Sequence, residues 1–179
     1  MSETYFDNAD WHFEDAHNVY SECFMNKHPQ AYIEWQATKK DIGFIEHCEE
    51  AAEAVFRRAA FHMGVYMAWI IRYEFEGKIH KEESADDLEK VRNRQMTGTE
   101  FILKRCDGKL WAEDLNEEGL AFTRSYYEEH YLMDFADLAL GIADGPYTLE
   151  DGWENYQEFA QMLDEAYENW KKGKPGRVR

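Results

Sequence analysis

Seven histidines are the first residues to consider, because imidazole is both a common metal ligand and a common acid–base catalyst. They are His12, His17, His28, His47, His62, His80 and His130. No H-E-x-x-H motif places two of them on one helix face around a zinc ion. Because no such motif is present, we expect no metal site and no cofactor. A metal site assembled from scattered ligands stays open as an alternative.

The stretch from Asp114 to Gly119, D-L-N-E-E-G, resembles the first half of a calcium-binding loop. The twelfth position of such a loop must supply a bidentate glutamate. This chain has Ser125 at that position. The stretch fits better as the start of a helix, with Asn116 as the N-cap residue and acids in the first turn. We therefore expect no calcium site.

The sequence contains no local motif for a catalytic nucleophile either. Cys23, Cys48 and Cys106 are far apart and form no C-x-x-C pair. This spacing favours reduced, buried thiols in a cytoplasmic protein over a disulfide framework or a zinc site. The sequence also lacks a G-x-S-x-G elbow and a glycine-rich phosphate loop. We expect a protein that is not an enzyme.

Trp11, His12 and His62 are the residues from which a small-ligand pocket could be built. Trp11 and His12 could instead anchor the N-terminal segment on the core, which is the preferred interpretation. His62 falls on the apolar face of an expected helix. At such a position a buried histidine with a hydrogen-bond partner is more common than a catalytic one. A pocket around these three residues stays open as an alternative.

Carboxylates at helical spacing point to a different kind of site, a surface for a basic protein. One row holds Glu46, Glu49, Glu50 and Glu53, and a second block holds Glu113, Asp114, Glu117 and Glu118. Such rows are often simply solvated, but they can also pair with Lys and Arg of a partner. Aromatic rings interleave with acids over residues 3–35, where Trp35 is an expected anchor if the rings are not core.

The charge distribution supports this direction. The chain has 179 residues and a formal net charge of −17. Residues 107–170 hold 17 acids and 2 bases, whereas residues 51–106 hold 9 acids and 10 bases. Nucleic-acid binders and proteins for anionic membranes need clustered Lys and Arg, so we expect neither partner.

Helical periodicity dominates the chain. The expected helices span residues 10–26, 29–38, 44–75, 84–95, 97–103, 116–132, 134–140 and 148–170. The helix at about 44–75 is apolar nearly all round beyond Ala59, which is typical of a buried central helix. Thr97 with Glu100 forms a capping box, while Ser84 with Asp87 and Thr148 with Asp151 are variants of one. We find no run with a period of two.

These patterns predict an all-α, single-domain, irregular helical bundle around the central helix. The domain covers residues 1–172, and the basic residues 173–179 form a flexible tail. The N-terminus has no secretory signal, and the longest apolar stretch, residues 63–71, is too short to span a membrane. We expect a cytoplasmic location.

Several motifs resemble an uncharacterised bacterial family of small acidic proteins. They are D-N-A-D-W-H from Asp7, H-M-G-V-Y-M-A-W from His62, and C-D-G-K-L-W-A-E-D-L-N-E-E-G from Cys106. The last block is the most specific. Residues of about 13–52 look like an insertion relative to that family. In size and acidity its members are similar to the immunity proteins that accompany bacterial toxin domains.

The resemblance and the charge together suggest an immunity protein. It would bind a basic toxin domain, with a nuclease expected, delivered by contact-dependent growth inhibition or a similar system. Its carboxylates would occlude the Lys and Arg that the toxin uses for phosphates. One alternative is a DNA-mimic inhibitor of a host-defence nuclease. Another is a small-ligand binder or enzyme with a pocket around Trp11, His12 and His62.

Overall fold

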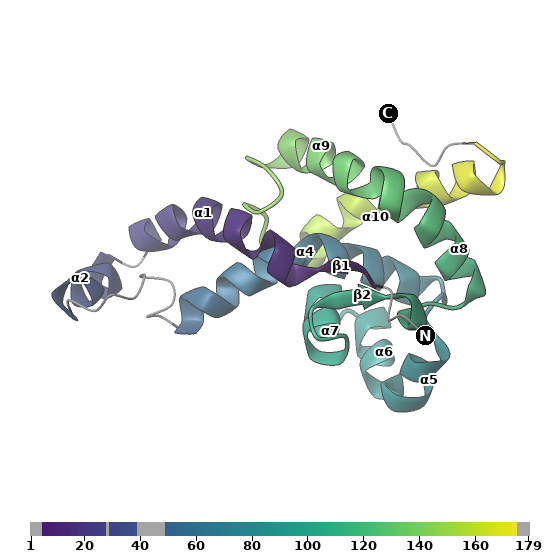
Figure 1. Cartoon of the computed structure of the whole chain (residues 1–179), viewed down its shortest axis with the longest axis horizontal. Helices are drawn as coiled ribbons and strands as arrows, with labels where there is room; N and C mark the ends of the chain where they lie inside the picture. Colours follow the sequence, from purple (N-terminus) through teal and green to yellow (C-terminus); the bar gives the residue numbers. More distant parts are fainter. Residues whose placement is uncertain (1–4, 28, 39–48, 175–179) are drawn as a thin grey trace.

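The computed structural model describes residues 5–27, 29–38 and 49–174, apart from the side chains of residues 22–24, 49 and 50 (Figure 1). Its elements are β1 (Tyr5–Asn8), α1 (Ala9–Lys27), α2 (Pro29–Thr38), α4 (Glu49–Arg72), α5 (Lys78–Glu83), α6 (Ala85–Arg92), α7 (Gly98–Arg105), β2 (Lys109–Trp111), η1 (Ala112–Asp114), α8 (Glu117–Tyr126), η2 (Tyr127–Tyr131), α9 (Leu132–Ile142) and α10 (Trp153–Lys171). The chain is mostly helical and forms one domain, which confirms the expected all-α class.

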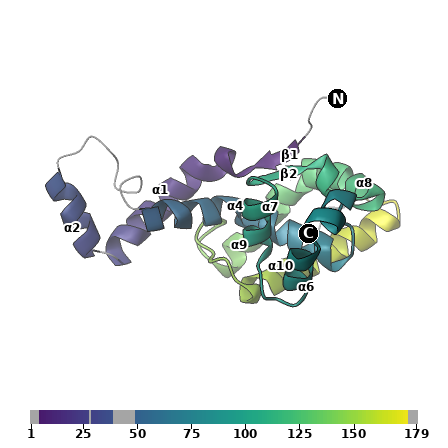
Figure 2. The same cartoon turned by 90° about the horizontal axis from the view of Figure 1, so that it is seen from below.

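Helix α4 lies at the centre of the fold (Figures 1 and 2). Every residue from Ala59 to Ile71 is buried, so the expectation of a buried central helix is confirmed. The helix ends earlier than expected, at Arg72, because Glu74 adopts a left-handed conformation with φ 59°. Residues 44–48, the expected start of this helix, lie outside the described part of the chain.

Helix α7 packs against α4 at unusually close range, and two glycines allow it. A Cβ atom on Gly98 would lie 1.9 Å from the carbonyl oxygen of Gly64, and one on Gly64 would lie 2.3 Å from Thr99 Oγ1. The expected capping box at the start of α7 is present. The Glu100 amide donates to Thr97 Oγ1 at 3.1 Å, and the Thr97 amide donates to Glu100 Oε2 at 2.9 Å.

On another side of α4 lie α8, η2, α9 and α10. The first three run without a break, whereas two separate helices were expected, because a π-helical turn at η2 links α8 directly to α9. Phe135 of α9 stacks on Phe159 of α10 with ring centroids 4.3 Å apart, and both rings contact Phe61 of α4. This aromatic contact joins three helices into one core.

A small antiparallel sheet of β1 and β2 corrects the expectation that the chain has no strands. Tyr5 pairs with Trp111, and Asp7 pairs with Leu110. With four and three residues, these strands are too short to show an alternating pattern in the sequence. The sheet brings the N-terminal segment against the turn at Asp107 and Gly108, both of which have positive φ.

Two of the expected caps are not formed. Ser84 precedes α6 but makes no side-chain cap, and α10 begins at Trp153 with Gly152 as its N-cap residue. The Thr148 hydroxyl donates to the Gly145 carbonyl, and Asp151 accepts from the Thr97 hydroxyl. A local turn therefore engages Thr148, and a tertiary contact engages Asp151, in place of the expected cap of α10.

Helix α1, helix α2 and the first half of α4 form an arm that projects from the body (Figures 1 and 2). The arm contains most of the expected insertion at residues 13–52. A small separate core holds α1 against α4, built from Ala16, Tyr20, Ala51, Val55 and Ala59. Helix α2 has no buried residues. Among the described helices, none combines the length and apolar character needed to cross a membrane.

Candidate functional site

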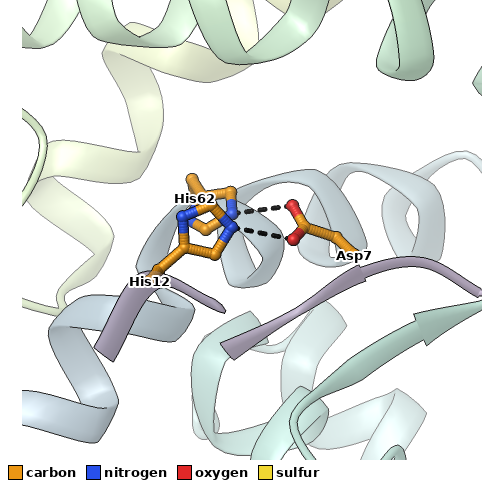
Figure 3. Close-up of side chains that lie close together, drawn as sticks. All are labelled: Asp7, His12 and His62. Carbon is orange, nitrogen blue, oxygen red and sulfur yellow. Dashed lines mark hydrogen bonds and ion pairs between the residues drawn. The ribbon is translucent and has the colours of Figure 1, made fainter. Parts of the chain in front are cut away.

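Two buried clusters of potential ligand residues flank the small sheet. The first joins Asp7 of β1, His12 of α1 and His62 of α4 (Figure 3). The Nε2 atom of His12 lies 2.8 Å from Asp7 Oδ1, and the Nε2 atom of His62 lies 2.9 Å from Asp7 Oδ2. The carboxylate therefore ties together three elements that are distant in sequence.

The hydrogen-bonding capacity of Asp7 is filled. Its Oδ1 also accepts the Asn8 amide at 2.8 Å, and its Oδ2 also accepts the Tyr127 hydroxyl at 2.7 Å. Each oxygen thus has two donors, which is the number of lone pairs a carboxylate oxygen offers in its plane. The Tyr147 hydroxyl lies 3.1 Å from His12 Nδ1, so this ring is held at both nitrogens. The arrangement is that of a closed structural hub.

Electrostatics agree with a charged carboxylate at Asp7. Burial would raise the pKa of Asp7, but hydrogen bonds from His12 and His62, with their charge, outweigh it and hold that pKa far below its usual value. Burial lowers the pKa of His62 below 6.5, against the opposing effect of Asp7. Burial and the charge of Asp7 raise the pKa of Tyr127, so its hydroxyl keeps its proton and donates.

The residues of the expected ligand pocket are only partly brought together. His12 and His62 lie next to each other, with their ring centroids 4.3 Å apart. However, the carboxylate of Asp7 binds the Nε2 atom of each ring. Trp11 is 59% exposed, and its ring packs on Tyr5 at the surface. His12 thus anchors the N-terminal segment on the core, as preferred, whereas Trp11 does not.

The second cluster contains His80 of α5, Cys106 at the end of α7 and Asp114 of η1, all of which are buried. His80 Nε2 lies 2.8 Å from Asp114 Oδ1 and 3.8 Å from Cys106 Sγ. The other oxygen of Asp114 accepts the Trp111 amide at 2.6 Å. Burial, reinforced by the charge of Asp114, raises the pKa of Cys106 well above its usual value.

This cluster lies in the wall of a pocket of about 820 Å³. The pocket is lined by both charge signs, with Lys104, Arg105 and Arg124 as the cations and Glu83, Asp107 and Glu113 as further acids. Lys104 and Arg105 are already paired with the buried Asp87, at 2.8 and 2.7 Å. Since several lining residues are exposed, the pocket opens to solvent.

The expected partner-binding acids have different fates. Glu113 of η1 is exposed, as are Glu117 and Glu118 at the start of α8, whereas Asp114 is buried and bound to His80 and Trp111. The side chain of Asp114 therefore points into the fold and not toward solvent.

The first acidic row is described at one position only. Glu53 is exposed and pairs with Arg57 at 3.2 Å. Glu46 lies outside the described residues, as do the side chains of Glu49 and Glu50. Trp35 is half-buried on α2 and packs on Tyr32, with ring centroids 5.4 Å apart.

Helix α9 presents an unexpected apolar surface. Its residues Leu132, Met133, Leu140 and Ile142 are between 42% and 63% exposed. The expected helix at residues 134–140 was identified by its apolar spacing, and such spacing cannot show which of two faces meets the core.

His80 and Cys106 were missed as site residues because their spacing to Asp114 matches no short motif. One signal was available. Asp7, His12, His62, Cys106 and Asp114 all fall within the motifs that carry the family resemblance. Four of these five side chains are buried, and each belongs to one of the two clusters.

Comparison with known proteins places both clusters within the match to one family model. A family model described as a domain of unknown function, DUF7832, matches residues 5–148, which include every residue of the two clusters. No curated protein and no solved structure matches the chain. The chain belongs to the DUF7832 family, a domain family of unknown function.

Proposed function

We propose that this protein is an immunity protein that binds a basic bacterial toxin domain and occludes its active site. The toxin domain that fits the proposal best is a nuclease. The observation that carries the proposal is the exposed apolar face of α9, bordered by acids that have no basic partner among the described residues. We define the α9 surface as the residues Glu128, Leu132, Met133, Asp137, Leu140, Ile142 and Asp144.

The acids of this surface are free to pair with a partner. Glu128, Asp137 and Asp144 are exposed, and no Lys or Arg of the described residues lies within ion-pair distance of them. The same holds for Glu113 of η1 and for Glu117 at the start of α8. The helices from α8 to α10 thus carry a negative charge that the fold does not neutralise.

Apolar side chains next to acids fit a basic protein better than either feature alone. Exposed apolar residues anchor an interface through burial, while the surrounding charges speed association and select the partner. A nuclease must present Lys and Arg to phosphates, so a carboxylate surface of this kind can cover them. The expected complex forms quickly and weakens as salt rises.

The other two candidate functions have less support. A DNA mimic needs carboxylates spaced like phosphates along one face, whereas the α9 surface has apolar residues between its acids. A ligand pocket around Trp11, His12 and His62 is disfavoured because Asp7 binds both histidines and Trp11 faces solvent.

The test begins with the immobilised full chain exposed to an extract of its native host and eluted along a salt gradient. The proposal expects one basic toxin domain, released as salt rises, that arrests growth unless the full chain is co-expressed. Capture of a host nuclease of a defence system would favour the DNA mimic instead. Failure to retain any basic protein would overturn the proposal.

Variants locate the interface once the toxin is cloned. We expect Glu128→Lys with Asp137→Lys to lower the association rate by about tenfold or more. We expect Met133→Ser with Leu140→Ser to raise Kd by about tenfold. Matched controls are Glu82→Lys with Glu89→Lys, and Ile33→Ser, all at exposed sites. Equal effects of test and control variants would refute the α9 surface as the interface.

A further inference from the structure

The geometry of the second cluster shows three ligating atoms that converge on one point. Asp114 Oδ1 and Cys106 Sγ both approach the same nitrogen, His80 Nε2, and the three atoms lie within 4.8 Å of one another. They come from three separate elements, α5, the end of α7 and η1. Such convergence of a thiol, an imidazole and a carboxylate in a buried place is the arrangement of metal ligands.

A catalytic triad does not explain the same contacts. In a Cys-His-Asp triad, the nucleophile and the orienting carboxylate contact opposite nitrogens of the imidazole. Here both contact Nε2. A divalent cation at the common point would instead contact all three ligating atoms.

The two distances to His80 Nε2 need little adjustment for zinc. With bonds of about 2.3 Å to sulfur and about 2.0–2.1 Å to nitrogen, tetrahedral geometry separates the two ligand atoms by roughly 3.5 Å. The observed separation of Cys106 Sγ and His80 Nε2 is 3.8 Å. The His80–Asp114 contact of 2.8 Å would lengthen by roughly half an ångström as its hydrogen bond is replaced by two metal bonds.

The surrounding structure holds the ligands in place. The Trp111 amide fixes Oδ2 of Asp114 and leaves Oδ1 directed at His80. The Gly77 amide donates to the Asp114 carbonyl at 2.7 Å, which positions the start of α5 against η1. Phe101 packs edge-on against the His80 ring, with centroids 5.0 Å apart. Supporting contacts of this type orient metal ligands in proteins.

The carboxylate of the first cluster differs from that of the second in how many hydrogen bonds it accepts. There, each histidine has its own oxygen of Asp7, and two further donors fill that carboxylate. At the second cluster, Asp114 has one further donor, and the cluster borders a pocket that opens to solvent. Three protein ligands beside an open cavity are typical of zinc sites that keep one position for water or a ligand.

We propose that His80, Cys106 and Asp114 bind one Zn²⁺ ion, with the fourth coordination position open to the pocket of about 820 Å³. A thiolate, an imidazole and a carboxylate together suit zinc better than the oxygen-preferring Mg²⁺ or Ca²⁺. This inference is independent of toxin binding, because the cluster and the α9 surface share no residue.

The test uses the full chain, freed of metal by a chelator and carrying no affinity tag. Zn²⁺ binding is followed by calorimetry, and Co²⁺ is used as a spectroscopic probe because its thiolate complexes have a charge-transfer band in the near ultraviolet. We expect one Zn²⁺ per chain, a cobalt–thiolate band, and a higher Tm in the presence of Zn²⁺. The absence of saturable binding would overturn the proposal.

Variants separate this site from other sites on the chain. Cys106→Ser should abolish the cobalt–thiolate band and weaken Zn²⁺ binding by at least roughly 100-fold, more than the loss of a supporting contact costs. Its Tm without metal shows whether it folds. The controls are His12→Gln, in the first cluster, and the pair Cys23→Ser with Cys48→Ser, which removes the other two thiols. Loss of binding in either control, or full binding by Cys106→Ser, would assign the ion elsewhere.

Discussion

The replacement Asp7→Asn tests whether the first cluster holds the fold together. Asp7 is 2% exposed and accepts four hydrogen bonds, two at each oxygen, at 2.7–2.9 Å. An amide keeps one oxygen and its two acceptor positions, but its nitrogen would meet two donors. The change removes the charge without changing the volume, so packing does not enter.

The expected loss of stability follows from the two hydrogen bonds that are lost if the amide nitrogen replaces Oδ2, which accepts from His62 and Tyr127. A hydrogen bond to a charged group contributes about 1.5–3 kcal/mol, so Asp7→Asn should lower the free energy of unfolding by about 3–6 kcal/mol. This is a large share of the roughly 5–15 kcal/mol by which a domain is stable. Solvent screening requires no reduction of the figure, since both His62 and Tyr127 are buried as well.

Urea unfolding at pH 7, followed by far-ultraviolet circular dichroism and tryptophan fluorescence, measures this change. The control is Asp137→Asn, an exposed site on α9 that should change stability by less than about 0.5 kcal/mol. A loss below about 1 kcal/mol for Asp7→Asn would refute the view that the four donors depend on this carboxylate.

Two further predictions test the packing and the protonation state of the same core. Gly98→Ala should destabilise the fold by about 3 kcal/mol or more, because its Cβ would lie 1.9 Å from the Gly64 carbonyl. Gly141→Ala, whose Cβ would meet nothing within 4 Å, should instead stabilise it by up to about 1 kcal/mol, and equal Tm shifts would contradict the proposed close contact. Burial keeps the pKa of His62 below 6.5, so as the pH falls through that value His62 binds a proton more readily in the unfolded chain than in the folded one. The free energy of unfolding is therefore highest above that pH and decreases as the pH falls. Urea titrations from pH 7.5 to about 5 should show a slope contribution of up to about 1.4 kcal/mol per pH unit that is absent in His62→Gln, and an unchanged slope would exclude this role.

The sequence alone determined the helical class and most helix positions, because these depend on local periodicity and on capping groups close in the chain. Helix α2 was predicted with its observed bounds, Pro29–Thr38, and the Thr97–Glu100 capping box is present as expected. The buried character of α4 also followed from its composition, since a helix that is apolar nearly all round can only be stable inside a core. The unpaired excess of acids over residues 107–170 was visible without any structure.

Tertiary structure alone decided which polar residues meet. Asp7 reaches His62 only because β1 pairs with β2 and lies beside α4, and strands of four and three residues leave no pattern in the sequence. His80 and Asp114 are 34 residues apart, and the close contact of Gly77 with η1 brings them together. Asp114 was expected at the surface because it belongs to an acidic block in the sequence, but the turn of η1 directs it inward. Local spacing cannot encode such contacts, because they depend on how separate elements pack in three dimensions.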